Sequence, residues 1–215
     1  MGHLFLDIET YLSPLDPESS LNPYKKDSKV IVIAYSYYKG FAPPKKDEIK
    51  PPVFLKEWES SEKEILRSFL SFLQNANKSD KYIRICGFNV LKFDLPYLFG
   101  RMKFHGLADE NELHDLLFLP FGTDLMQLSP IISQKTLQHS QLWGISHKDA
   151  CSFFSLAVKE GTGADCSSFY DKKEYGKIMK YCAEEFNFEQ LLEAFYLHIV
   201  EKGTGKEAEA RQRNE

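Results

Sequence analysis

Short apolar runs, separated by proline-rich and polar segments, fill the first part of the chain. Runs of β-branched and aromatic residues that are bounded by turn-forming residues are typical of buried strands. Residues 11–28 contain Pro14, Pro17 and Pro23 and indicate a loop, and residues 41–52, rich in proline and lysine, indicate a second connection. The pattern therefore predicts strands at residues 3–8, 30–38, 53–55 and 82–88.

Apolar residues at helical spacing predict helices between and after these strands. Ser61 and Glu64 form a capping-box pattern, which predicts a helix that begins there and continues until residues 75–80 interrupt it. Pro96 suits the first turn of a second helix, which the pattern places at residues 93–105. The remaining segments predict a strand at residues 116–119, a short helix at 134–143 and mostly helix over 172–200, and they leave residues 147–168 undefined.

The order of these elements defines an α/β chain, because strands come early and helices lie between and after them. A length of 215 residues, of which 43% are hydrophobic, suits a single domain with its own core. We place that domain at residues 1–201. Residues 202–215 are polar, and we expect them to be a disordered tail.

Composition narrows the range of partners and locations. The net charge of −4 repels phosphate, so a nucleic-acid partner requires a local basic patch on the protein. No apolar run approaches the ~18 residues of a membrane span, so we expect no membrane partner. The four cysteines are too widely spaced for a zinc or redox motif, and we expect reduced thiols in a cytoplasmic protein.

Two acids lie on the first predicted strand. Asp7 and Glu9 are separated by one residue, so their side chains point to the same face of the strand. Two adjacent carboxylates repel each other, and an unpaired charge is costly to bury beside apolar neighbours such as Phe5 and Ile8. A divalent cation between the carboxylates would offset both costs. The alternative is an exposed strand end with two solvated acids.

A second pattern of polar residues lies near the C-terminus. Tyr181 and Glu185 are four residues apart and share one face of a predicted helix. In one site, the carboxylate would hold a metal and the phenol would position or polarise an attacking water. The alternative is a core tyrosine beside a surface acid. A third group, Asn89, Phe93 and Asp94, lies where a predicted strand passes into the next helix.

Together these segments resemble the DEDD superfamily of 3′–5′ exonucleases, and they are most similar to the proofreading exonuclease domain of family B DNA polymerases. Residues 5–10 are similar to the first motif of that family, and residues 87–98 are similar to the second. Tyr181 and Glu185 stand where the third motif has Tyr-x-x-x-Asp, which indicates the tyrosine branch of the superfamily. The resemblance extends over residues 4–197.

The resemblance implies a ribonuclease-H-like fold, in which helices flank a mixed β-sheet. It also implies a metal-dependent 3′–5′ exonuclease that hydrolyses single-stranded nucleic acid, DNA in preference to RNA, to nucleoside 5′-monophosphates. Two Mg²⁺ or Mn²⁺ ions would be its cofactors in a two-metal mechanism, with Asp7 as the bridge between them. By the same resemblance, the expected metal ligands are Asp7, Glu9, Asp94 and Glu185, Tyr181 completes the catalytic set, and Thr10, Asn89 and Phe93 contact the substrate.

One departure from the family pattern leaves alternatives open. Glu185 stands where the family has Asp, and the extra methylene shifts a carboxylate in a site where Mg²⁺ tolerates little distortion. The first alternative is a catalytically weak or inactive module that binds nucleic acid or associates with a polymerase. The second is an unrelated metal-binding hydrolase. Expected partners are the 3′ ends of single-stranded DNA or RNA, together with replication or repair proteins.

Other polar residues are not assigned to this site. His105, His114, His139 and His147 show no tight ligand spacing, and we expect them to be ordinary polar or packing residues. Asp124 is expected in a surface loop, with indirect support of the site as the alternative. The segments at residues 161–163 and 203–206 contain glycine but do not fit a phosphate-binding loop, and we expect flexible linkers there.

Overall fold

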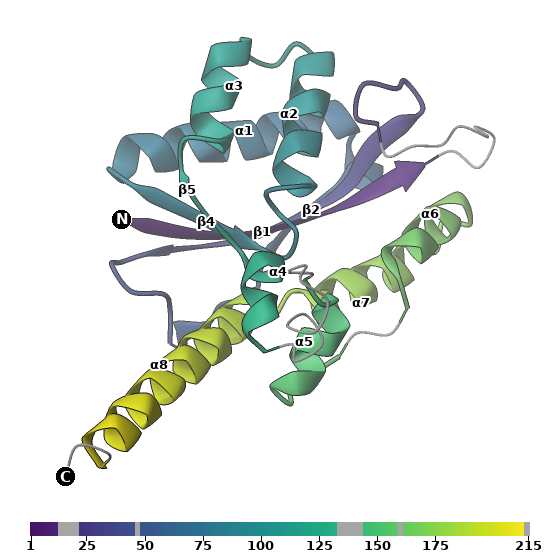
Figure 1. Cartoon of the computed structure of the whole chain (residues 1–215). Coiled ribbons are helices and arrows are strands. Elements are labelled where there is room, and N and C mark those ends of the chain that lie inside the picture. Colours follow the sequence, from purple (N-terminus) through teal and green to yellow (C-terminus); the bar gives the residue numbers. More distant parts are fainter. Residues whose placement is uncertain (13–21, 46–47, 133–143, 159–160, 213–215) are drawn as a thin grey trace.

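The computed structural model describes residues 1–12, 22–45, 48–132, 144–158 and 161–212. Within these residues, strands β1 (Gly2–Leu12), β2 (Ser28–Lys39), β3 (Val53–Lys56), β4 (Ile83–Gly87) and β5 (Phe121–Asp124) form one sheet (Figure 1). Their order across the sheet is β3-β2-β1-β4-β5. The central strand, β1, is antiparallel to β2 and parallel to β4, so the predicted mixed α/β sheet is confirmed.

Helices cover both faces of the sheet (Figure 1). One face carries α1 (Glu62–Ser79), α2 (Asp94–Phe104) and α3 (Glu110–Leu117). The other face carries α5 (His147–Phe153), α6 (Gly163–Asp171), α7 (Tyr175–Glu185) and α8 (Phe188–Gln212). Three short helical turns complete the described elements, namely η2 (Glu57–Glu59), α4 (Leu125–Leu128) and η3 (Ser129–Ile131).

Alternate residues of β1 face opposite cores. Leu4 and Leu6 pack with α1, α2 and α3, whereas Phe5 packs with α4, α5 and α8. Because side chains alternate along a strand, Asp7 and Glu9 share the Phe5 side of the sheet. The sheet therefore directs both acids toward the layer that the C-terminal helices form.

Helix α1 begins where the capping pattern predicts. The Ser61 hydroxyl accepts a hydrogen bond from the Glu64 backbone N–H at 3.3 Å, which satisfies one donor of the first turn. Ile65, Phe69 and Leu73 recur at helical spacing and are buried against the sheet. Local sequence and tertiary packing therefore agree on this helix.

A buried ion pair ties α2 to its neighbours. Arg101 is 2% exposed, and its Nε and Nη2 donate to the two Glu62 carboxylate oxygens at 2.7 and 2.6 Å. Its Nη1 donates to the backbone carbonyls of Pro23 and Lys25, both at 2.9 Å. Glu62 also accepts from the Val30 backbone N–H at 2.8 Å. One guanidinium and one carboxylate thus join α1, α2, β2 and the segment that precedes β2.

The predicted strand at residues 116–119 is wrong. Leu116 and Leu117 instead form the end of α3 and are buried together with Leu113. The Asp109 carboxylate caps this helix by accepting two backbone N–H groups of its first turn, each at 3.0 Å. The apolar run that indicated a strand is therefore the buried side of a short capped helix.

The helical pattern over residues 172–200 is interrupted once. It divides into α7 and α8 at Phe186 and Asn187, and α8 continues to Gln212 through most of the segment expected to be a disordered tail. The undefined segment at residues 147–168 contains α5 and the start of α6. The predicted helix at residues 134–143 lies outside the described residues. In the part of the chain that is described, no helix is both long enough and apolar enough to cross a bilayer.

Candidate active site

Asp7 and Glu9 lie where β1 extends past its neighbour β4. The parallel pairing of these two strands ends at Phe5 and Cys86, so both acids follow the last paired residue. They are 9% and 7% exposed, and the register between β1 and β2 shifts directly after Glu9. Two carboxylates are therefore held almost out of solvent at the carboxyl end of the central strand.

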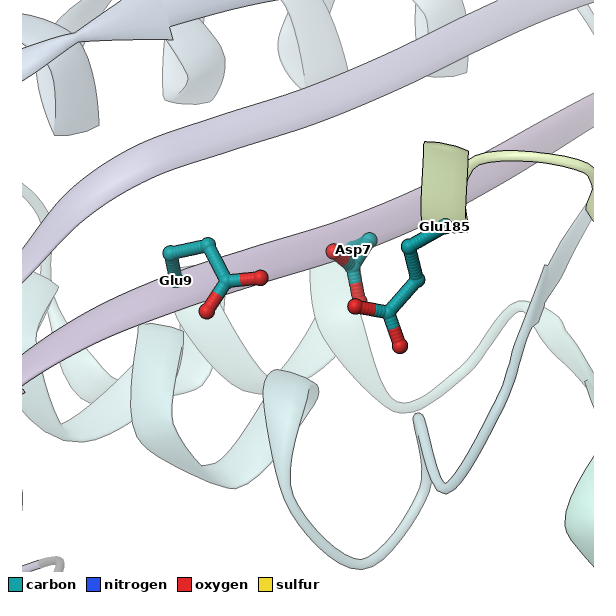
Figure 2. Close-up of side chains that lie close together, drawn as sticks. All are labelled: Asp7, Glu9 and Glu185. Carbon is teal, nitrogen blue, oxygen red and sulfur yellow. The ribbon is translucent and has the colours of Figure 1, made fainter. Parts of the chain in front are cut away.

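Glu185, the last residue of α7, completes a group of three acids. One carboxylate oxygen from each of Asp7, Glu9 and Glu185 lies within 4.8 Å of the other two. Figure 2 shows the three side chains pointing into the same space, two from β1 and one from the helix end. Carboxylates this close repel one another unless a cation lies among them, and oxygen donors suit Mg²⁺ and Mn²⁺. The donor set thus fits a hard divalent cation.

The glutamate at position 185 reaches the other acids despite its extra methylene. Helix α7 ends at this residue, and the Asn187 backbone N–H donates to the Glu185 carbonyl at 2.8 Å. The side chain extends from that end and brings its carboxylate into the group with Asp7 and Glu9. The longer side chain therefore does not remove the third acid from the site.

Asp94 borders the group from the opposite layer of the molecule. It is the first residue of α2, it is buried, and its Oδ1 accepts from the Ile8 backbone N–H at 3.0 Å. Burial raises the pKa of the Asp94 carboxyl to about 8, and the negative charge of Glu185 adds to the rise. A cation beside Asp94 would act in the opposite direction and favour the carboxylate.

Tyr181 lies one helical turn before Glu185 and is buried. Burial raises the pKa of its phenol well above the usual value, and the Glu185 carboxylate raises it further. Tyr181 is therefore an uncharged hydrogen-bond donor at neutral pH. Burial likewise raises the pKa values of the Cys166 and Cys182 thiols, so uncharged side chains lie behind the acids.

The predicted residues meet in one cavity of about 480 Å³. Its walls also include Phe88, Met126, Ser146 and His147, and none of the described residues that line it is Lys or Arg. Among the described residues, a negatively charged phosphate in this cavity would meet His147 but no lysine or arginine side chain. All eight residues that the sequence predicts for the site line this cavity, namely Asp7, Glu9, Thr10, Asn89, Phe93, Asp94, Tyr181 and Glu185.

His147 lines the cavity, although the sequence patterns indicate only an ordinary packing residue. Its Nε2 lies 3.0 Å from Asn187 Oδ1, and its ring packs edge-on against Phe88 with centroids 5.2 Å apart. Asn187 donates its own amide N–H to the Ala157 carbonyl at 3.2 Å, which leaves Oδ1 as an acceptor for His147. These partners come from separate elements, so no spacing rule along the chain indicates them.

The expectation that Asp124 lies in a surface loop is wrong. Asp124 is 5% exposed and forms the junction between β5 and α4. Its Oδ1 caps α4 by accepting from the Met126 backbone N–H at 3.0 Å. The residue borders the segment that carries Asn89 but does not itself line the cavity.

Comparisons with known proteins identify the family and support the fold. Residues 3–159 match the family described as DNA polymerase family B, exonuclease domain. No curated protein matches the chain. Among solved structures, the family B DNA polymerase from the hyperthermophilic archaeon Pyrobaculum calidifontis is similar, with a TM-score of 0.58 and 17% sequence identity. That match covers 89% of this chain and 24% of the polymerase chain, and at this identity it shows the fold alone.

The matched segment contains two of the three motif regions. It includes the acids of β1 and the segment from Asn89 to Asp94, and it ends before Tyr181 and Glu185. The structure supplies the third region, because it places both of these residues in the cavity with the other two. The family match covers well over half of the 215 residues. The chain therefore belongs to the exonuclease domain family of the family B DNA polymerases.

Proposed function

We propose that the protein is a metal-dependent 3′–5′ exonuclease. It shortens single-stranded nucleic acid from the 3′ end, acts on DNA in preference to RNA, and releases nucleoside 5′-monophosphates. The observation that carries this proposal is the group of three carboxylates within 4.8 Å in a cavity that Asp94 and Tyr181 also line. Family membership supports the reaction class, since the matched family consists of exonuclease domains.

The acids of the cavity would hold two divalent cations, Mg²⁺ or Mn²⁺. Asp7 is the proposed shared ligand, because it lies in the group with Glu9 and Glu185 and belongs to the strand whose Ile8 N–H binds Asp94. Bound cations would lower the pKa of an attacking water and offset the charge that develops on the phosphate. The chain offers no Lys or Arg in the described lining of the cavity for that second task.

The remaining residues would orient the reactants. Tyr181 keeps its proton at neutral pH and is proposed to donate a hydrogen bond that positions the attacking water. Asn89 and Phe93 lie on the α2 side of the cavity and are proposed to hold the terminal nucleotide, and Thr10 is proposed to contact its 3′ end. Phe88 and Met126 contribute apolar side chains to the cavity wall.

A gel assay on 5′-labelled single-stranded DNA and RNA tests the proposal. With Mg²⁺ or Mn²⁺ the wild-type protein should produce a ladder that shortens from the 3′ end, faster for DNA than for RNA. EDTA should abolish it, and Asp7→Ala should lower the rate by about a thousandfold or more. A folded Asp7→Ala variant that retains full activity would show that the proposed site is not the catalytic one.

A second candidate function is a module that binds nucleic acid, or associates with a polymerase, without efficient cleavage. The observation that favours it is Glu185, which stands where the family motif has Asp. In this case the wild-type protein would bind a labelled single strand but leave it uncleaved with either metal. Replication or repair proteins are the proposed partners under both functions, since the matched family consists of exonuclease domains of DNA polymerases.

A further inference from the structure

The Asp124 carboxylate binds the backbone of the segment that carries Asn89. Its Oδ1 accepts from the Asn89 N–H at 2.8 Å, and its Oδ2 accepts from the Leu91 N–H at 3.2 Å. Oδ1 also accepts from the Met126 N–H at 3.0 Å. Asn89 and Met126 both line the cavity, whereas Asp124 does not. One buried carboxylate thus connects two parts of the cavity wall from behind.

The bound segment makes a tight turn. Asn89 has a φ of 64°, in the left-handed region that asparagine adopts more readily than most residue types. The Asn89 carbonyl accepts from the Phe93 N–H at 2.9 Å, so the turn at Asn89 determines where Phe93 and the start of α2 lie. The hydrogen bonds that Asp124 accepts from Asn89 and Leu91 hold the first residues of this turn against the end of β5.

The hydrogen-bond partners of the Asp124 carboxylate are backbone N–H groups. The residue is 5% exposed, and among the described residues no basic side chain forms an ion pair with it. A buried carboxylate is tolerated when N–H donors satisfy its oxygens, and such charge-assisted hydrogen bonds are stronger than neutral ones. Three backbone N–H groups therefore satisfy the carboxylate, and two of them, from Asn89 and Leu91, fix the shape of residues 89–91.

We propose that Asp124 is a positioning residue for the substrate strand. It holds residues 89–93 in the conformation that presents Asn89 and Phe93 to the terminal nucleotide, and it thereby sets the affinity for the strand. This inference rests on the proposed exonuclease function. The three grouped acids come from β1 and α7, outside the turn that Asp124 holds, and Asp94, which begins α2 directly after that turn, is also held by its own hydrogen bond from the Ile8 backbone N–H.

Two substitutions separate this role from helix capping. Asp124→Asn keeps one carbonyl oxygen for Asn89 and Met126 but turns an amide N–H toward the Leu91 N–H, so two donors face each other. Asp124→Ser keeps a good cap for α4 but is too short to hold the Asn89 segment as well. For both variants we expect KM for an oligothymidylate strand to rise about tenfold, with kcat changed less than about twofold.

Asp109→Asn is the matched control. The Asp109 carboxylate also caps a helix by accepting hydrogen bonds from backbone N–H groups, but it lies at the start of α3 and not in the cavity wall. This variant should lose some thermal stability, less than Asp124→Asn because Asp109 is exposed, and should keep the wild-type KM. The comparison distinguishes a local effect on the strand from a general loss of stability.

The experiment distinguishes a failure of the positioning role of Asp124 from a failure of the proposed exonuclease function. If the wild-type protein cleaves and both Asp124 variants keep its KM, or lose only kcat, the positioning role is refuted. If the wild-type protein does not cleave, the exonuclease proposal fails, and fluorescence anisotropy with the same strand still tests the positioning role through a tenfold weaker binding. Two unfolded Asp124 variants beside a folded Asp109→Asn would assign Asp124 to the fold and overturn the inference.

Discussion

At the scale of single residues, Glu185 shows how one methylene decides where a helix-end carboxylate lies. Its oxygen lies within 4.8 Å of those of Asp7 and Glu9. Glu185→Asp keeps the charge but withdraws the carboxylate toward α7 by roughly one bond length, in a site where Mg²⁺ tolerates little distortion. We expect kcat/KM for a single strand to fall about tenfold in this variant.

The neighbouring Glu184 provides the control for this change. Glu184→Asp makes the same truncation one residue away, outside the group of three acids, and should keep wild-type kinetics. Steady-state kinetics with Mg²⁺ and with Mn²⁺ measures both variants. A Glu185→Asp enzyme that is faster than the wild type would identify the natural glutamate as a weakening departure and support the binding-module function.

Glu189 gives a prediction about stability and pH. It is buried at the start of α8, where it accepts hydrogen bonds from the hydroxyls of Ser36 at 2.5 Å and Tyr38 at 3.3 Å. Burial raises its pKa, so its contribution to stability is fully present below the unfolded-state pKa and is lost as the pH rises through the folded-state value. Glu189→Gln keeps the acceptor without the charge, and it should raise the unfolding free energy near pH 8 by about 1 kcal/mol.

Urea unfolding across the acidic to mildly alkaline range checks this sign. The advantage of Glu189→Gln should shrink as the pH falls and should vanish well below about 4.3, where the wild-type carboxyl is protonated in both states. Glu193→Gln, on the same helix and only half-buried, should show no such pH-dependent gain. A destabilised Glu189→Gln at every pH would mean that the buried charge is favourable.

Sequence predicts the residues of this site better than it predicts their supports. The acids on β1, the Asn89 to Asp94 segment and the Tyr181–Glu185 pair are visible because each has a local pattern of spacing. Asp124 and His147 have no such pattern, since their partners lie on other elements. Their burial is a result of tertiary packing, which a single sequence does not display.

At the scale of elements, the Arg101–Glu62 pair holds α2 in place. Arg101→Met removes the guanidinium and leaves the buried Glu62 carboxylate with the Val30 N–H and, at 2.7 Å, His105 Nε2 as its partners, which should cost up to about 3–5 kcal/mol of unfolding free energy. The double variant Glu62→Gln/Arg101→Met removes the stranded charge while the Gln carbonyl still accepts from the Val30 N–H. We expect it to recover part of the loss in urea denaturation.

Arg101→Lys distinguishes charge from geometry in the same pair. Lysine keeps the positive charge but lacks the fork that serves Glu62, Pro23 and Lys25 together, so it should lie between the wild type and Arg101→Met. A lysine variant as stable as the wild type would mean that the carbonyl contacts to the segment before β2 contribute little. If Arg101→Met and Glu62→Gln/Arg101→Met were equally stable, the buried Glu62 charge would not be the cause of the loss.

The elements themselves were predictable where local and tertiary preferences agree. Strand β2 is β-branched and aromatic, α1 has a capping serine and a regular apolar stripe, and both form as predicted. The segment at residues 116–119 misleads because four successive apolar residues fit a strand as well as a helix. The deciding feature is the Asp109 cap, which lies outside that run.

At the scale of the whole molecule, the proposed metal site joins the first strand to a helix near the other end of the chain. In EDTA, the three grouped carboxylates repel one another, so Asp7→Asn should unfold about 2–4 °C above the wild type. Saturating Mn²⁺ should reverse this order, because a ligand that binds only the folded state stabilises it by about 2.7 kcal/mol at a hundred times its Kd. Scanning calorimetry with EDTA or Mn²⁺ measures both shifts, and a wild-type Tm that is the same in EDTA and in Mn²⁺ would argue against a folded-state cation site.

Under the proposed function, the acidic cavity would also determine an order of events. Four carboxyl groups and, within the described residues, no Lys or Arg line the space that the terminal phosphate would enter. Without cations the cavity would therefore repel the phosphate, and the strand would bind only after cations have bound. Cation availability would then act as a gate, and the strand would be the last to arrive and the first to leave. An enzyme of this kind would leave nucleic acid uncleaved wherever free divalent cations are scarce.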